Sequence, residues 1–356
     1  MKHFIYFGTY TQTPTPGLHR KEGIYIYQYD PISQIATFSS VVENVINPSF
    51  LGIHPNKRWF YAVNELMEGQ VSAFKVDPAS GSLRFLNQQP TDGSAPCYVC
   101  IDPSGKWLLI PNYGNGTLAV FPILADGRLG PHTDYIEHRG LGTDPSRQEN
   151  AHAHSVIFDP TGRFALAADL GIDQILIYRL DAEKGKLIPN TPPFTQLVKG
   201  AGPRHMAFNL NGKVMFVANE LDSTVTAFHW DAKKGTLTAF QTLSTLPKDF
   251  TGKSAVADIH LEPSGHFLYI SNRGHNSLAV YKVSEEGALT FIECVSTGGN
   301  WPRNFAILPP GNLILAANEH TGNAVTFRID KETGKPVPTG WEYGVPQPVC
   351  VLPVEL

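Results

Sequence analysis

Arginine, glutamate and histidine recur at two positions of a sequence pattern, and together these residue types could bind an anion and move protons. His154 and Arg204 stand near the start of apolar runs, whereas Glu220 and Arg273 directly follow the ends of others. The planar guanidinium of arginine binds carboxylate or phosphate through two parallel hydrogen bonds. A histidine and a glutamate among arginines can transfer protons near neutral pH. Such a set could hydrolyse an anionic substrate if the fold gathers it.

A repeat of roughly 50 residues predicts the elements that would gather these side chains. Each copy reads as an apolar run, a turn, an alternating run, a short turn and a second alternating run, as in ENAHAHSVIFDPTGRFALAADLGIDQILIY at 149–178. The first turn recurs at Pro55, Pro103, Pro160, Leu210, Pro263 and Pro309. Four short strands in a repeat of this length are typical of one blade of a β-propeller.

The six copies of the repeat do not include the two ends of the chain, and these ends together supply the strands of a seventh copy. Near the N-terminus, HFIYFGTYT and GIYIYQYD read as the second and third strands of a blade, while QPVCVLPV at 347–354 reads as a first strand. We therefore expect residues 1–356 to form a single all-β domain. It would be a seven-bladed β-propeller with four antiparallel strands per blade, its ring closed by the C-terminal strand joining the N-terminal blade. Closure of the ring removes open sheet edges.

The blade geometry predicts which side chains share one mouth of the central channel. In an antiparallel meander the start of the first strand lies beside the end of the second. The first-strand position is occupied by Ser49, Cys97, His154, Arg204, Ala257, Arg303 and Gln347. The position after the second strand holds Tyr10, Glu65, Tyr113, Leu170, Glu220, Arg273 and Glu319. Arg204 and Glu220 should therefore meet at this mouth, where the charges either bind an anionic ligand or pair with one another around a wet channel.

Composition excludes several classes of partner. The 356 residues carry 28 basic and 32 acidic side chains, a net charge of −4, with no basic block of the kind that follows a phosphate backbone. We expect no nucleic-acid partner. No segment approaches membrane-spanning length, and MKHFIYFGTYTQ lacks an apolar run long enough for a signal peptide. A cytoplasmic protein without membrane attachment is expected.

The remaining motifs carry little chemistry. Cys97 and Cys100 have CxxC spacing, but no second pair follows, and in the strand predicted there the two side chains face opposite ways. No GxSxG nucleophile motif occurs. The longest departure from the repeat, at about 131–151, leads directly into His154 and could form a lid over the mouth.

Several ordered motifs resemble one family of known proteins. GTYT, AHSV and DPTGRF, GPRHMAF, ANELDSTV, SNRGHNSLAVY and WPRNFAI are similar to segments of the seven-bladed propeller lactonases. That family includes bacterial 6-phosphogluconolactonases and the fungal carboxy-muconate lactonising enzyme. The resemblance spans essentially the whole chain and implies opening or closing of a lactone without a metal or other cofactor. By alignment with the active site proposed for the muconate enzyme, it implies catalytic roles for His154, Arg204, Glu220 and Arg273.

We therefore expect a lactonase that hydrolyses an anionic sugar lactone, most naturally 6-phosphogluconolactone. A general base, either His154 or Glu220, would activate water, and arginine would stabilise the oxyanion. The candidate substrate-binding residues are Arg303, Glu65, Glu319 and His152. His152 lacks a family counterpart, and a loop or supporting role suits it better than metal ligation. Two alternatives are an enzyme for a muconate-type or unphosphorylated lactone and a non-catalytic propeller that only binds partners.

Overall fold

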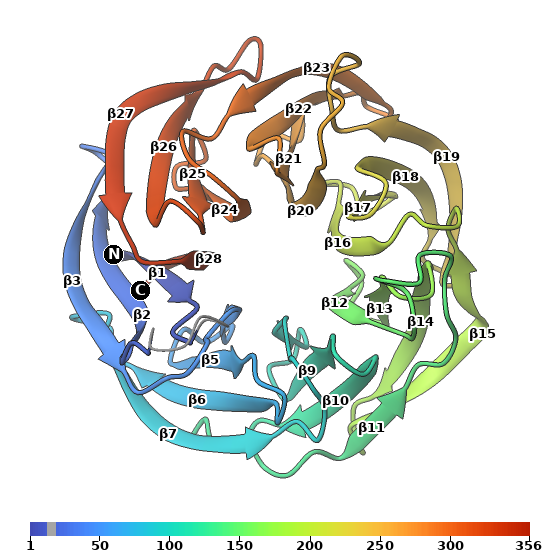
Figure 1. Ribbon diagram of the computed structural model, residues 1–356. Coiled ribbons are helices and arrows are strands. Elements are labelled where there is room, and N and C mark those ends of the chain that lie inside the picture. The colour runs from blue at the N-terminus through green and yellow to red at the C-terminus, as the bar shows by residue number, and fades with distance from the viewer. Residues whose placement is uncertain (13–18) are drawn as a thin grey trace.

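The computed structural model describes residues 1–12 and 19–356, which form seven four-stranded antiparallel sheets around a central axis (Figure 1). The sheets are called blades 1 to 7 here, and each runs outward from the axis. Blade 1 comprises β28 (Pro348–Glu355), β1 (His3–Thr9), β2 (Glu22–Asp30) and β3 (Ile35–Glu43). Blade 2 comprises β4 (Leu51–Ile53), β5 (Trp59–Asn64), β6 (Gln70–Val76) and β7 (Leu83–Pro90). Blade 3 comprises β8 (Cys100–Ile101), β9 (Trp107–Asn112), β10 (Thr117–Pro122) and β11 (Asp134–Glu137).

The other four blades follow the same order along the chain. Blade 4 comprises β12 (Ala153–Phe158), β13 (Phe164–Asp169), β14 (Gln174–Asp181) and β15 (Lys186–Gln196). Blade 5 comprises β16 (Pro203–Phe208), β17 (Val214–Asn219), β18 (Thr224–Asp231) and β19 (Thr236–Ser244). Blade 6 comprises β20 (Ala255–Leu261), β21 (Phe267–Arg273), β22 (Ser277–Val283) and β23 (Leu289–Ser296). Blade 7 comprises β24 (Pro302–Leu308), β25 (Leu313–Asn318), β26 (Asn323–Ile329) and β27 (Pro336–Gly344). The predicted seven-bladed propeller is confirmed.

The ring closes as the sequence predicts. Strand β28 pairs antiparallel with β1, placing Phe7 opposite Val351, and β1 pairs with β2 on its other side. The two ends of the chain lie together in Figure 1, where the amide of Lys2 donates to the carbonyl oxygen of Leu356 at 3.1 Å. Within residues 1–12 and 19–356, no helix is long and apolar enough to cross a membrane.

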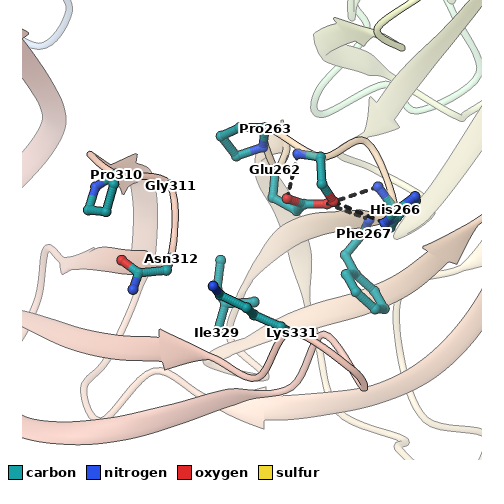
Figure 2. A pocket seen from close by; sticks show the side chains of 10 residues that line it. Glu262, Pro263, His266, Phe267, Pro310, Gly311, Asn312, Ile329 and Lys331 are labelled. Carbon is teal, nitrogen blue, oxygen red and sulfur yellow. Dashed lines mark hydrogen bonds between the residues drawn. The ribbon is translucent and has the colours of Figure 1, made fainter.

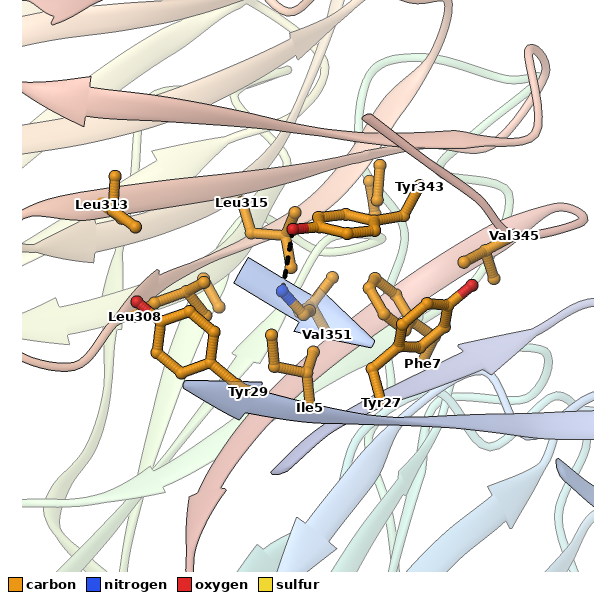
Figure 3. Packing of buried hydrophobic residues seen from close by; sticks show 14 residues of the cluster. Ile5, Phe7, Tyr27, Tyr29, Leu308, Leu313, Leu315, Tyr343, Val345 and Val351 are labelled. Carbon is orange, nitrogen blue, oxygen red and sulfur yellow. Dashed lines mark hydrogen bonds between the residues drawn. The ribbon is translucent and has the colours of Figure 1, made fainter. Parts of the chain in front are cut away.

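The core lies between neighbouring blades, which explains why the second strands are apolar on both faces. Every residue of β5, β13, β17 and β25 is buried, because each blade is packed between two others. Figure 3 shows the cluster that joins blades 7 and 1, in which Ile5 and Phe7 pack with Leu313 and Leu315. The amide of Ala36 donates to the hydroxyl of Tyr343 within this cluster, at 3.0 Å.

Two local expectations need correction. The segment at 131–151 is not wholly an insertion, because β11 within it pairs with β10 as the fourth strand of blade 3. The predicted strand through Cys97 is also shorter than expected, since β8 begins only at Cys100. The two thiols are buried in different surroundings. Cys97 Sγ lies 3.2 Å from the carbonyl oxygen of His154, whereas Cys100 packs in the hydrophobic cluster between blades 3 and 4.

Strand β28 should be required for a closed, stable ring. Deleting residues 348–356 would expose the inner edge of β1 and remove buried side chains such as Val349 and Val351, each contributing about 1.5 to 3 kcal/mol. We expect aggregation or a large fall in melting temperature, measured by size-exclusion chromatography and thermal unfolding. Deletion of Leu356 alone is the control. A truncated protein that stays monomeric with an unchanged melting temperature would show that closure is dispensable.

Candidate active site

A bulge at the start of three inner strands turns one side chain per blade toward the central axis. The pairing register shifts between Ala153 and Ser155 in β12, between Pro203 and His205 in β16, and between Pro302 and Asn304 in β24. The extra residues are His154, Arg204 and Arg303. A bulge re-aims the side chain of its extra residue, so these three leave the packing between blades.

The ends of the second strands bring the other charged residues to the same mouth. Pro203 pairs with Asn219, so Arg204 and Glu220 lie on adjacent strands as predicted, with Arg204 Nε 2.9 Å from Glu220 Oε2. A pocket of about 190 Å³ opens at this mouth. Its lining residues are Tyr10, Glu65, Cys97, Tyr113, Arg147, His154, Glu220, Arg273 and Arg303. The structure thus gathers five of the eight predicted site residues around one cavity.

Three arginines surround the carboxylate of Glu220. Arg204 and Arg273 lie 2.9 and 2.8 Å from Oε2, and Arg147 lies 2.5 Å from Oε1. Burial by itself would raise the pKa of Glu220, but the positive charges of Arg273, Arg204 and Arg147 hold it well below its usual range. Glu220 is therefore ionised at neutral pH, with its two oxygens in different surroundings.

His154 is buried in a field of positive charge. Its ring lies edge-on to Tyr113 and His205, and Nδ1 is 3.9 Å from Cys97 Sγ. Burial, assisted by the charges of Arg204, His205, Arg303 and Arg273, lowers the pKa of His154 well below its ordinary value. The imidazole is neutral at pH 7, and the same field would favour a negative charge beside it.

The other side of the pocket is built around Arg303. Its guanidinium lies over the ring of Tyr10 at 5.4 Å and 3.8 Å from Glu65 Oε2, while the Tyr10 hydroxyl donates to Glu65 at 3.0 Å. Burial alone would lower the pKa of Arg303, but Tyr10, Glu65 and Glu319 raise it overall. Arg303 thus carries a fixed positive charge at the pocket.

Three predicted residues lie behind the pocket lining. Arg204 is wholly buried, and its Nη1 donates to the carbonyl oxygen of Ala257 at 2.5 Å. His152 stacks on Tyr113 at 4.5 Å, with Nδ1 2.7 Å from the Tyr113 carbonyl oxygen, which is a supporting position. Glu319 acts on Arg303 through its charge rather than by a direct ion pair within 4 Å among the described residues.

Sequence reasoning missed Arg147, which reaches the pocket from the loop before β12. The loop lies across blade 4, where Gln148 Nε2 donates to Leu170 O and Asp173 Oδ1, both at 2.8 Å. Gly171 permits this approach, since a Cβ there would lie 2.0 Å from the carbonyl oxygen of Asn150. The available signal was an arginine in the segment that departs from the repeat and leads into His154.

Two larger cavities are lined by acidic groups that already have partners. Figure 2 shows one of them, lined by residues of blades 6 and 7, where Glu262 accepts hydrogen bonds from the amides of Ser264 and His266 and so closes its own turn. Its volume is about 580 Å³. A cavity of about 670 Å³ follows the axis, and there Asp258 is held by His205 at 2.8 Å and His260 at 2.9 Å. Among residues 1–12 and 19–356, no group of three or more histidine, cysteine or acidic side chains is arranged to hold a metal ion.

Comparisons with known proteins agree on one family. The family described as "Lactonase, 7-bladed beta-propeller" matches residues 4–353. The 6-phosphogluconolactonase of Bacillus subtilis (strain 168) is 37% identical over 352 residues, covering 98% of each chain. The 6-phosphogluconolactonase of Formosa agariphila is 35% identical over 321 residues, covering 88% of this chain and 90% of that one. Among solved structures, the periplasmic gluconolactonase PpgL of Pseudomonas aeruginosa is 31% identical, with a TM-score of 0.93 and coverage of 100% and 99%.

The low pKa of His154 should make the free energy of unfolding depend on pH. Between pH 7.5 and 5.5 the unfolded chain protonates this histidine, at a pKa of about 6.5, whereas the folded protein does not, so acidification favours unfolding. The loss over this window is about 1.4 kcal/mol, and His154→Gln should remove it. Denaturant unfolding at both pH values measures this, with exposed His229→Gln as the control. An equal pH dependence in wild type and His154→Gln would contradict a neutral buried imidazole.

Arg204 should be important for stability as well as for the position of Glu220. Arg204→Lys keeps the charge but cannot maintain contacts with Glu220, Ala257 and His205 together. Leaving buried polar groups unpaired costs about 1 to 3 kcal/mol, so the melting temperature should fall. Exposed Arg139→Lys is the matched control. Equal melting temperatures for Arg204→Lys and wild type would show that these contacts contribute nothing.

Proposed function

Because this chain belongs to the seven-bladed β-propeller lactonase family, we propose that it is the lactonase that hydrolyses 6-phosphogluconolactone. The observation that carries the choice of substrate is the charge of the pocket. Three arginines but only two glutamates line it, and Arg204 lies directly behind. A site with surplus positive charge and neutral His154 suits an anionic sugar lactone.

The hydrolysis adds water to the lactone carbonyl carbon and breaks the bond between that carbon and the ring oxygen. A base takes one proton from the attacking water, and the ring oxygen receives a proton as it leaves as a hydroxyl group. The carbonyl oxygen carries negative charge in between and needs hydrogen-bond donors or cations. The product is an open-chain acid, which ionises to a carboxylate.

The environment of each side chain favours a division of roles. Burial and the surrounding positive charges lower the pKa of His154 and so disfavour proton uptake by its imidazole, but the same charges stabilise an oxyanion beside it. We assign the stabilisation of the oxyanion to His154 and Arg273. Glu220 lines the pocket in its ionised form, but the three arginines that keep its pKa low also weaken it as a base. We assign the removal of the water proton to Glu220 in the state in which Arg147 has left Oε1. Arg204 positions Glu220 from behind, while Arg303, supported by Tyr10, Glu65 and Glu319, holds the substrate's polar groups.

An unphosphorylated sugar lactone is the second candidate substrate, because the solved neighbour PpgL is named a gluconolactonase. The family and the polar pocket favour an enzyme over a propeller that only binds partners. The four cysteines are all free thiols, which supports the cytoplasm as the proposed compartment.

Purified protein should hydrolyse 6-phosphogluconolactone well above the spontaneous rate and faster than δ-gluconolactone. His154→Gln keeps an N–H donor but cannot accept a proton, so it should retain much of the turnover. His154→Leu should lose about 10²-fold or more, as when one oxyanion donor is removed. Stopped-flow detection of acid release, corrected for the uncatalysed reaction, measures each rate. No rate above background would defeat the assignment of the substrate, whereas equal losses in both variants would make His154 the base.

A further inference from the structure

The two oxygens of Glu220 are held in unequal ways. Oε2 is contacted by Arg204 and Arg273, whose side chains are only 2% and 6% exposed and which come from the propeller strands. Oε1 is contacted by Arg147, whose side chain is 39% exposed. The oxygen available for proton transfer in the pocket is therefore covered by the most accessible of the three arginines.

Arg147 is also attached differently from the other arginines. Its backbone lies in a loop that is fixed by Gln148, while the side chain reaches across to Glu220 Oε1 and the hydroxyl of Tyr113 through the single atom Nη2. Rotation of this side chain would leave the strands and the loop backbone in place. If Arg147 moved away from Oε1, Glu220 would still have two buried counter-charges, Arg204 and Arg273.

We propose that Arg147 determines specificity for the phosphorylated substrate: it binds the phosphate group and, in doing so, uncovers Oε1 of Glu220 for proton transfer. The inference rests on the proposed function. Phosphate is a dianion with several acceptor oxygens, which the guanidinium can bind through two hydrogen bonds, whereas the present contact to Glu220 uses one nitrogen. The phosphate thus competes with Glu220 for Arg147, and the contact of Arg147 with Glu220 involves only one nitrogen atom at the accessible edge of the pocket.

The consequence is that the phosphate should raise kcat and not merely lower KM. Substrate without phosphate would bind while Arg147 still covers Oε1, so the base would remain occupied. Binding energy from a remote, non-reacting group would in this way be used to complete the catalytic site, as in induced-fit specificity. Once uncovered, Oε1 takes the proton of the attacking water, and that proton passes to the ring oxygen when the carbon–oxygen bond breaks.

Arg147→Gln tests the phosphate contact. Turnover of 6-phosphogluconolactone should fall about 10²-fold or more in kcat/KM, whereas turnover of δ-gluconolactone should rise, because Oε1 is no longer covered. Arg139→Gln is the matched control, since this arginine lies in the same segment, is 83% exposed and pairs only with Glu137 among the described residues. The melting temperature of each variant verifies folding.

Inorganic phosphite tests the uncovering step with the phosphate group supplied separately. Phosphite should accelerate hydrolysis of δ-gluconolactone by the wild-type enzyme and by Arg139→Gln, but not by Arg147→Gln. Inhibition or no effect in the wild type would overturn the inference. So would an unchanged preference for the phosphorylated lactone in Arg147→Gln. If the wild type does not hydrolyse 6-phosphogluconolactone at all, the proposed function fails and this inference fails with it; the other two outcomes overturn the inference alone.

Discussion

The extra residue at the start of the inner strands is the constraint on which the site depends. A regular strand at this place would direct alternate side chains into the apolar packing between blades, where a charge is costly to bury. The bulges at His154, Arg204 and Arg303 instead turn those side chains toward the axis. Because the inner strands of all blades converge there, residues some 50 positions apart in sequence become neighbours. The packing between blades and the polar mouth can therefore coexist on the same strands.

Burial of so much charge is possible because the charges compensate one another. The carboxylate of Glu220 contacts arginines from blade 5, from blade 6 and from the loop before blade 4, and it thereby connects three parts of the ring. The arginines also repel one another: burial, together with the charges of Arg273 and Arg303, lowers the pKa of Arg204 to about 10, whereas the charge of Glu220 acts in the opposite direction. Burial, assisted by the positive charges that remain in the pocket, keeps His154 neutral, and the same charges attract an anion. Stability and chemistry at this mouth thus have the same electrostatic origin.

A symmetric scaffold acquires an asymmetric site through what each blade adds to the shared positions. Blades 1 and 7 contribute Tyr10 and Arg303, blade 5 contributes Glu220, and the loop between blades 3 and 4 contributes Arg147. The loop is the only one of these contributions that does not follow the repeat. Its anchoring on blade 4, through Gln148 and Asp173, places an accessible cation beside a buried carboxylate. The regular strands therefore provide fixed charges, and the loop provides one that can change partner.

The sequence by itself determined the seven blades, the closure by residues 347–354 and the meeting of Arg204 with Glu220, because these follow from a repeat and from antiparallel pairing. It also indicated the family, through motifs spread over the whole chain. Only the tertiary structure decided that Arg204 lies behind the pocket, that His152 supports Tyr113, and that Cys97 precedes its strand rather than belonging to it. Depth along the axis, burial and loop path depend on how blades pack against each other, and a repeat pattern does not contain that information. Arg147 shows this most clearly, since its position depends on a loop that no periodicity describes.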